Sequence, residues 1–218
     1  MSRPRGNVFL AGVGGQGILL ASEILGEAFL RGGYDVKKSE VHGMAQRGGA
    51  VTTHLRFGPK VHAPLIEPGT ADVLIAFEKL EALRFIHCLR PGGTALVNTQ
   101  EIPPAPVSSG QERYPERVEE RLREAAPNLH MVDALGAALA LHEVRAVNMV
   151  MTGAASHFLP LPEETYMEVL TARLPARFVD VNAQAFRAGR ALVAQPGAAW
   201  WTGSGESGGG VPTHGGDR

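Results

Sequence analysis

The feature that most constrains the fold is a glycine-rich turn near the start of the chain, made of Gly12, Val13, Gly14, Gly15, Gln16 and Gly17. It follows an apolar stretch at residues 7–11, which is typical of a buried strand. It precedes residues 16–30, whose apolar side chains recur at helical spacing. Glycines at 12, 14 and 17 permit a tight turn, a close backbone approach and close packing of the helix on the strand. The turn therefore predicts a Rossmann-like first half.

This turn can bind a ligand or serve packing alone. The free amides at the start of a helix favour an anion such as a phosphate. Glu40, at the end of the next predicted strand, stands where dinucleotide-binding proteins have the acid that binds ribose. A strand, a glycine turn and a helix can also pack together without any nucleotide. The residues of the turn leave both interpretations open.

The remaining chain alternates strands with helices before it becomes helical. The pattern predicts strands at residues 34–39, 50–57, 73–77, 94–97 and 129–132, and helices at 80–89, 115–126, 134–141, 148–158, 163–173 and 181–193. Such alternation predicts a three-layer α/β fold with a mostly parallel sheet and a helical C-terminal part. We expect a single domain over residues 1–194. Residues 195–218 are rich in glycine and are predicted to form a disordered tail.

Composition excludes several classes of protein. The chain has 218 residues, and 21 Lys and Arg against 22 Asp and Glu give a net charge of −1. We therefore expect no binding to nucleic acid or to a membrane surface. No apolar run approaches the ~20 residues of a membrane span, and glycines interrupt the apolar N-terminal stretch, so a cytoplasmic protein is predicted.

The cysteine and histidine content argues against a metal centre in this chain. Cys88 is the single cysteine, which excludes an internal disulfide framework and an iron–sulfur cluster held by this chain alone. The eight histidines show no metal-ligand spacing, so no metal site is predicted. Cys88 lies in a predicted amphipathic helix, where a buried structural thiol is expected.

A second motif spans residues 39–49 and gathers polar groups of four kinds around glycines. Its candidate ligand-binding or interface residues are Glu40, His42, Gln46, Arg47, Gly48 and Gly49. The guanidinium of Arg47 beside bare glycine amides suits a carboxylate or a phosphate. His42 can transfer a proton near neutral pH. A glycine-rich loop held by its own hydrogen bonds is the alternative.

Together the two motifs resemble the gamma-type subunit of 2-oxoacid:ferredoxin oxidoreductases. Within that family the chain is most similar to the small (beta) subunit of indolepyruvate ferredoxin oxidoreductases. The resemblance covers about residues 7–193, and the combination of both glycine motifs is its most specific part. Further matching positions lie at residues 71–74, 91–93, 98–99, 148–153, 182, 185–186 and 189.

The resemblance implies an enzyme subunit that is inactive alone and has no catalytic residue of its own. Such enzymes decarboxylate an arylpyruvate on thiamine diphosphate, pass electrons through iron–sulfur clusters to ferredoxin and transfer the acyl group to coenzyme A. Thiamine diphosphate, Mg and the clusters are expected in a large partner subunit, and none in this chain. The sequence agrees, because it has one cysteine and no Gly-Asp-Gly segment of the thiamine-binding type.

Within the expected complex, Arg47 and the two glycine loops are candidates for a wall that excludes water from the substrate or coenzyme A cleft. Three alternatives stay open. The chain can be a gamma subunit for another 2-oxoacid, such as pyruvate or a branched-chain oxoacid. It can be a free-standing NAD- or FAD-binding protein that uses Gly12, Gly14, Gly17 and Glu40. It can also be a purely structural assembly subunit.

Overall fold

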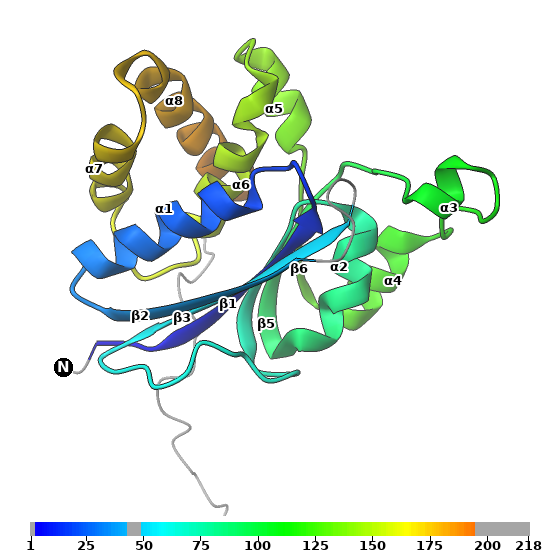
Figure 1. Cartoon of the computed structure of the whole chain (residues 1–218), viewed down its shortest axis with the longest axis horizontal. Coiled ribbons are helices and arrows are strands. Elements are labelled where there is room, and N and C mark those ends of the chain that lie inside the picture. Colours follow the sequence, from blue (N-terminus) through cyan, green and yellow to red (C-terminus); the bar gives the residue numbers. More distant parts are fainter. Residues whose placement is uncertain (1–2, 43–48, 195–218) are drawn as a thin grey trace, which may run out of the picture.

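The computed structural model describes residues 3–42 and 49–194, and these form three layers around a six-stranded sheet (Figure 1). The strand order is β2-β3-β1-β4-β5-β6. The strands are β1 (Gly6–Val13), β2 (Asp35–His42), β3 (Ala50–Gly58), β4 (Ala71–Ala76), β5 (Leu89–Asn98) and β6 (Asn128–Val132). Each predicted strand is present, with bounds that differ by a few residues.

The sheet is mostly parallel, as predicted, with one antiparallel strand. β1, β4, β5 and β6 pair in parallel, whereas β3 is antiparallel to both β1 and β2. β3 follows β2 after a short connection, and a short connection can join only antiparallel neighbours. The sequence pattern did not reveal that β3 lies between β1 and β2, which places the end of β2 away from β1.

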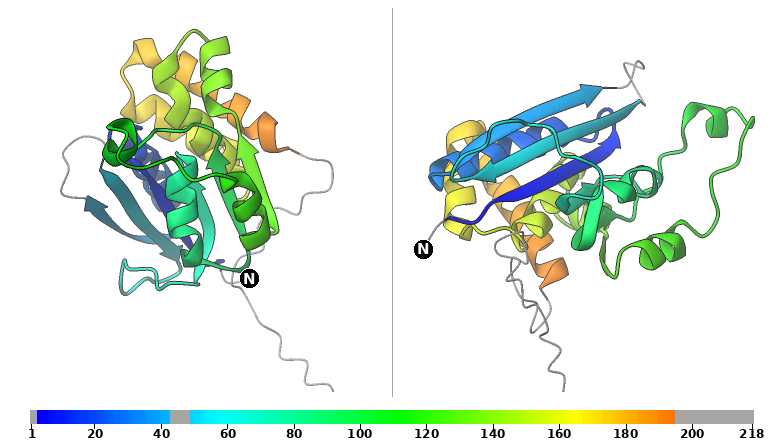
Figure 2. Two further views of the ribbon diagram at one scale, coloured as in Figure 1. Left: turned by 90° about the vertical axis from the view of Figure 1, so that its right-hand side faces the viewer. Right: turned by 90° about the horizontal axis from the view of Figure 1, so that it is seen from below.

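One face of the sheet is covered by α1 and by the helical C-terminal part, as both views of Figure 2 show. This layer contains α1 (Ile18–Arg31), α5 (Ala134–Ala140), α6 (Val147–Ser156), α7 (Glu163–Arg173) and α8 (Ala176–Val193). The main core lies between these helices and the sheet. In it, the ring of Phe29 from α1 stacks on that of Phe57 from β3 at a centroid distance of 3.8 Å.

The other face is covered by α2 (Lys79–Phe85), α4 (Val118–Ala125) and the connection between β3 and β4. Leu122 of α4 packs in a cluster with Val97 of β5. Cys88 lies in a 3₁₀ turn after α2 and is buried, as predicted, and burial raises the pKa of its thiol. A single helical turn, α3 (Ala105–Ser108), interrupts the predicted loop between β5 and α4.

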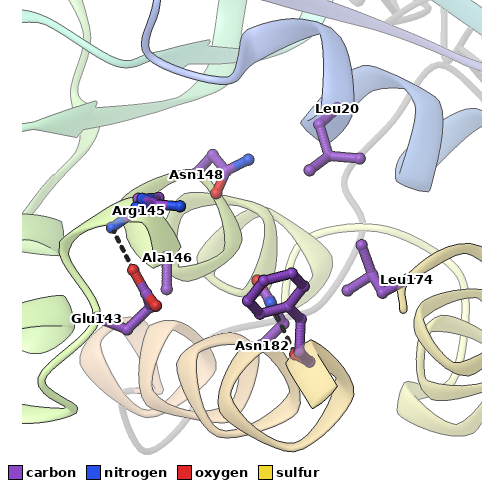
Figure 3. A pocket seen from close by; sticks show the side chains of 8 residues that line it. Leu20, Glu143, Arg145, Ala146, Asn148, Leu174 and Asn182 are labelled. Atoms are coloured by element: carbon purple, nitrogen blue, oxygen red, sulfur yellow. Dashed lines mark hydrogen bonds between the residues drawn. The ribbon is translucent and has the colours of Figure 1, made fainter. Parts of the chain in front are cut away.

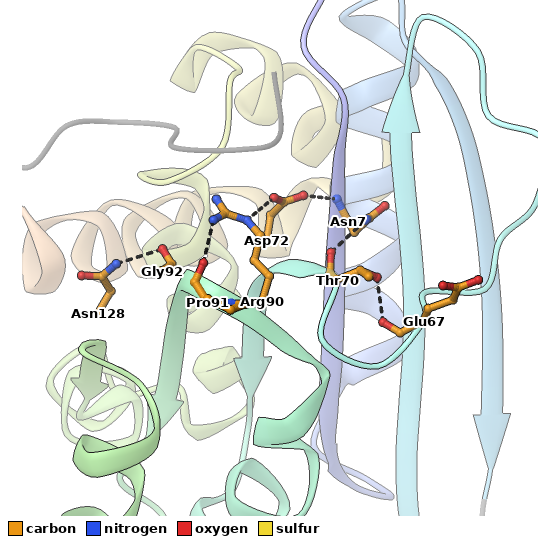
Figure 4. A network of polar contacts seen from close by, with 8 residues as sticks. All are labelled: Asn7, Glu67, Thr70, Asp72, Arg90, Pro91, Gly92 and Asn128. Atoms are coloured by element: carbon orange, nitrogen blue, oxygen red, sulfur yellow. Dashed lines mark hydrogen bonds and ion pairs between the residues drawn. The ribbon is translucent and has the colours of Figure 1, made fainter. Parts of the chain in front are cut away.

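Pro91, Gly92 and Gly93 are among the positions that carry the family resemblance, and they follow the predicted helix over residues 80–89. They lie inside β5, which leaves regular register with β4 at this point. Here Arg90 donates from Nε to Asp72 Oδ1 at 2.7 Å, and Asp72 also accepts the amide of Asn7 at 2.8 Å (Figure 4). The network joins β1, β4 and β5 at the amino edge of the sheet. Asp72, one of the positions that carry the family resemblance, therefore has a structural role.

Residues 195–218 lie outside the described residues, so the predicted tail stays a prediction. Among the residues that the structure describes, no helix has the length and apolar composition that crossing a membrane requires.

Candidate site at the carboxyl edge of the sheet

The glycine turn joins β1 to α1 with backbone angles that favour glycine. Gly15 has φ +103° and Gly17 has φ +77°, and Gly17 is the N-cap residue of α1. At Gly12 a Cβ would lie 2.8 Å from Ile18 Cδ1 and 2.9 Å from Phe77 Cβ. Packing and backbone conformation alone therefore account for these three glycines.

Gln16 supports the turn from inside. Its Oε1 accepts the amide of Val13 at 2.8 Å, and its Nε2 donates to the carbonyl of Phe77 at 2.7 Å. A longer contact of 3.4 Å joins Nε2 to Gln100 Oε1. The side-chain amide thus ties the turn to the end of β4, which makes Gln16 a positioning residue for the turn.

The two glycine motifs lie side by side. The amide of Gly14 donates to the carbonyl of Gly49 at 2.9 Å, and Val13 pairs with Ala50. His42 ends β2 in register with Val51, which is itself in register with Gly12. The second motif therefore re-enters the sheet beside the first, whereas it leaves the sheet from β2, with β3 between it and β1. Gln46, Arg47 and Gly48 lie outside the described residues.

Glu40 lies inside β2, which continues to His42, beyond the end at residue 39 that the sequence predicted. It is in register with Thr53 of β3 and, beyond it, with Leu10 of β1. Two strand spacings, about 10 Å, therefore separate the backbones of Glu40 and β1. The carboxylate of Glu40 pairs with Lys38 Nζ at 2.7 Å. In a dinucleotide fold the strand that carries the ribose acid adjoins the first strand, so this geometry differs from that arrangement.

A polar group that the sequence did not reveal lies next to the turn, where β4 and β5 end. Glu78 is 1% exposed; its Oε2 caps α2 by accepting the amide of Glu81 at 2.8 Å. Its Oε1 accepts the hydroxyl of Tyr114 at 2.6 Å and the amide of Ile102 at 3.2 Å. Burial and the neighbouring carboxylate raise the pKa of Tyr114. The sequence feature that could have pointed to Glu78 is its position directly after a buried strand.

A cavity of about 180 Å³ lies on the other side of the turn, toward the C-terminal helices (Figure 3). It is mainly apolar and is lined by Leu20, Glu143, Arg145, Ala146, Asn148, Leu174, Phe178 and Asn182. Asn148 donates to the carbonyl of Gly17 at 3.4 Å, which links this cavity to the glycine turn. Asn182 donates to the carbonyl of Phe178 at 2.8 Å. Asn148 and Asn182 are two of the positions that carried the family resemblance.

Fold and site together define a class: a three-layer α/β protein whose two glycine motifs meet at the carboxyl edge of the sheet. The chain belongs to the pyruvate ferredoxin/flavodoxin oxidoreductase family, whose model matches residues 7–192. It is a small subunit of the 2-oxoacid ferredoxin oxidoreductase type.

Individual relatives agree with this assignment. The chain is 41% identical to indolepyruvate oxidoreductase subunit IorB of Thermococcus kodakarensis, over 84% of this chain and 93% of that protein. It is 28% identical to the common gamma subunit of pyruvate/ketoisovalerate oxidoreductases from the same organism, over 80% and 89% of the two chains. The gamma subunit of a keto/oxoacid ferredoxin oxidoreductase from Geobacter sulfurreducens shares the fold, with a TM-score of 0.63, 22% identity and coverage of 86% and 98%.

Proposed function

We propose that this chain is the small subunit of an indolepyruvate (arylpyruvate) ferredoxin oxidoreductase and completes the substrate or coenzyme A cleft of a large subunit. The observation that carries the proposal is the bond from the Gly14 amide to the Gly49 carbonyl. It holds both glycine motifs at one edge, where ligand sites of open α/β sheets gather. At Gly15 a Cβ would meet nothing within 4 Å, so a partner or ligand can approach the backbone of the turn at that position.

The choice of an arylpyruvate as substrate rests on similarity. Identity is 41% to an indolepyruvate oxidoreductase subunit and 28% to a pyruvate/ketoisovalerate subunit. A subunit for pyruvate or a branched-chain oxoacid is the runner-up. Activity of the assembled complex with indolepyruvate, phenylpyruvate, pyruvate and 2-oxoisovalerate separates the two. A preference for an aliphatic oxoacid would contradict the proposal.

The redox chemistry belongs to the partner in this proposal. The large subunit holds thiamine diphosphate with Mg and the iron–sulfur clusters, passes electrons to ferredoxin and forms the acyl–coenzyme A product. With a single cysteine, this chain does not supply the four thiolates that a typical cluster requires. Its own contribution is to position the cleft and to exclude water from it.

The direct experiment is co-purification from the source organism, with an affinity tag on this chain. We expect a large protein with iron–sulfur absorbance and bound thiamine diphosphate to elute with it. A monomeric chain that elutes alone with a flavin or nicotinamide would support the NAD- or FAD-binding alternative instead. The pairing of Glu40 with Lys38 and the position of β3 argue against that alternative.

Arg47 provides a sharper test of the site. In the assembled complex, Arg47→Ala removes both the charge and the forked donor, whereas Arg47→Lys keeps the charge. If Arg47 binds the carboxylate of the substrate or a phosphate of coenzyme A, both variants assemble normally and the KM for one substrate rises about ten- to a hundredfold. His42→Asn, in the same motif, tests whether the imidazole contributes a proton, through the pH dependence of kcat. Wild-type kinetics and assembly in Arg47→Ala would remove Arg47 from the site.

A further inference from the structure

An arm leaves the body of the molecule at the same edge as the glycine turn. It comprises residues 99–117, between β5 and α4, and carries the single helical turn α3 at its tip (Figures 1 and 2). No residue of the arm is buried. Yet six successive residues of its outward half are apolar: Pro103, Ala105 and Pro106 are exposed, and Ile102, Pro104 and Val107 are half-buried. A run of apolar surface on a projecting segment marks an interaction site, since it gains nothing from exposure to water.

The tip of the arm is ordered by its own hydrogen bonds. The amides of Val107 and Ser108 both donate to the carbonyl of Pro104 at 2.9 Å, and the amide of Ser109 donates to Ala105 at 2.9 Å. The hydroxyl of Ser108 donates to the carbonyl of Pro103 at 3.1 Å. Prolines further restrict the backbone. The apolar tip therefore has a defined shape without support from the core.

A buried carboxylate clasps both ends of the arm. Glu78 Oε1 accepts the Ile102 amide at the outgoing end and the Tyr114 hydroxyl at the returning end. Beside it, Lys79 Nζ pairs with Glu101 Oε1 at 2.6 Å and Glu119 Oε1 at 3.4 Å, and its side chain is 13% exposed. These bonds fix the direction in which the arm leaves the body. A segment ordered before binding loses less entropy when it docks.

The root of the arm also contacts the glycine turn. Gln100 Oε1 lies 3.4 Å from Gln16 Nε2, the side chain that ties the turn to β4. The arm and the two glycine motifs therefore form one continuous edge of the molecule. If the glycine motifs face the large subunit, the arm points to the same partner.

We propose that residues 99–117 form a preorganised docking arm whose apolar tip inserts into an apolar groove on the large subunit, with Glu78 and Tyr114 as the clasp that sets its direction. This inference rests on the proposed function, because the large subunit is the partner named there. The arm adds an interface to the glycine motifs, and it uses no residue of the candidate ligand site.

The test is association of the purified chain with the large subunit of the same organism, measured by calorimetry or biolayer interferometry. Val107→Glu places a charge at the tip, where it contacts no core cluster, so the isolated chain should fold normally. The matched control is Leu65→Glu, in the connection between β3 and β4, whose side chain is 58% exposed at the opposite edge of the sheet. We expect Val107→Glu to weaken association at least about tenfold, because the tip then brings an unpaired charge into an apolar groove. Leu65→Glu should bind like the wild type.

The clasp is tested separately with Tyr114→Phe, which removes one bond to Glu78 and leaves the tip unchanged. We expect the dissociation constant to rise about three- to tenfold, from lost preorganisation and a lost hydrogen bond. Substrate KM values of the complex, measured with the large subunit in saturating excess, should not change.

The outcomes separate this inference from the proposed function. If the wild type and Val107→Glu both bind the large subunit equally well, the arm proposal is overturned while the proposed function stands. If sedimentation shows that the wild-type chain forms dimers that Val107→Glu dissociates, the tip contacts a second copy instead, which also overturns the proposal. If the wild type binds no large subunit, the proposed function fails and the arm proposal fails with it.

Discussion

Gly17 has a left-handed backbone, and a Cβ placed there would lie 2.6 Å from Asn148 Nδ2. Its role in starting α1 thus follows from one backbone angle and one neighbour on α6. Gly26, in the middle of the same helix, differs in both respects. It has helical geometry, and a Cβ there would lie 3.6 Å from Leu55 Cδ1, an ordinary contact. Steric reasons therefore explain the glycine at the N-cap of α1, whereas position 26 has room for a Cβ.

We expect Gly17→Ala to lower the free energy of unfolding by about 1–3 kcal/mol, because alanine is strained at positive φ and crowds Asn148. Gly26→Ala should raise it by about 0.5–1 kcal/mol, because alanine favours a helix. Urea denaturation of the isolated chain measures both. Equal effects of the two substitutions would show that the turn does not depend on the conformation of Gly17.

His54 is a second residue whose surroundings change its chemistry, in this case its protonation. Its Nδ1 accepts the amide of Ile66 at 3.0 Å, and its ring packs edge-on against Phe9 at 4.8 Å. Burial lowers the pKa of His54 from its ordinary value of 6.5. The folded chain therefore takes up a proton on this ring at lower pH than the unfolded chain does.

The stability of the folded chain should therefore decrease as the pH falls. The contribution of His54 to stability is complete above about pH 6.5 and is lost as pH falls through its lowered folded pKa. His130 and His157 have lowered pKa values too, chiefly through burial, and act in the same direction. Unfolding free energies of the wild type should therefore decrease from about pH 7.5 to about pH 5.5. In His54→Asn, whose amide oxygen can accept the Ile66 amide without titrating, the decrease should be smaller; an identical slope would exclude His54 as a contributor.

At the scale of elements, two glycines among the positions that carry the family resemblance, Gly153 and Gly189, lie where two helices meet. α6 and α8 pack closely, and a Cβ on Gly153 would collide with the backbone of Phe186. A Cβ on Gly189 would likewise collide with the backbone of Val150. The small residues let the two helices approach each other, so packing explains the resemblance at Gly153 and Gly189.

Gly153→Ala should force α6 and α8 apart. We expect a loss of about 1–3 kcal/mol in unfolding free energy, because a rigid backbone faces the new methyl group. Gln184→Ala, on the exposed side of α8, is the control and should change stability by less than about 0.5 kcal/mol. Thermal or urea unfolding followed by circular dichroism measures both. A stable Gly153→Ala variant would mean that the crossing can relax.

At the scale of the whole molecule, the two edges of the sheet differ in what they carry. The amino edge is closed by the network of Asp72 and Arg90, and the carboxyl edge carries the glycine motifs, the clasp and the arm. One edge therefore stabilises the sheet, while the other presents backbone and an apolar tip. This polarity suits a subunit that completes a site on another protein.

For the isolated chain we expect no oxoacid-dependent reduction of viologen or ferredoxin. The reason is that the sequence has one cysteine, where a typical iron–sulfur cluster takes four thiolates, and no Gly-Asp-Gly segment of the thiamine-binding type. Adding the large subunit should restore activity in proportion to complex formed, measured by viologen absorbance. Turnover by the chain alone, after chelation of metals, would contradict its role as a supporting subunit.

The sequence by itself determined the elements and the family. Hydrophobic periodicity located every strand and the main helices, because period 2 and period 3.6 are local properties of a chain. The glycine turn after β1 showed where an α/β unit begins. Boundaries were less accurate: α8 begins at Ala176 and not near residue 181, since its first turns are half exposed and carry a weak apolar pattern.

Only the tertiary structure decided which distant residues meet. β3 lies between β1 and β2, which separates Glu40 from the glycine turn, and no local pattern encodes strand order. Gln16 was a candidate ligand residue, but its amide is held between Val13 and Phe77, across 61 positions of the chain. Glu78 meets Tyr114 across 36 positions. Such contacts depend on how the sheet and its helices pack, so a sequence pattern can suggest the polar residues but cannot tell which of them become partners.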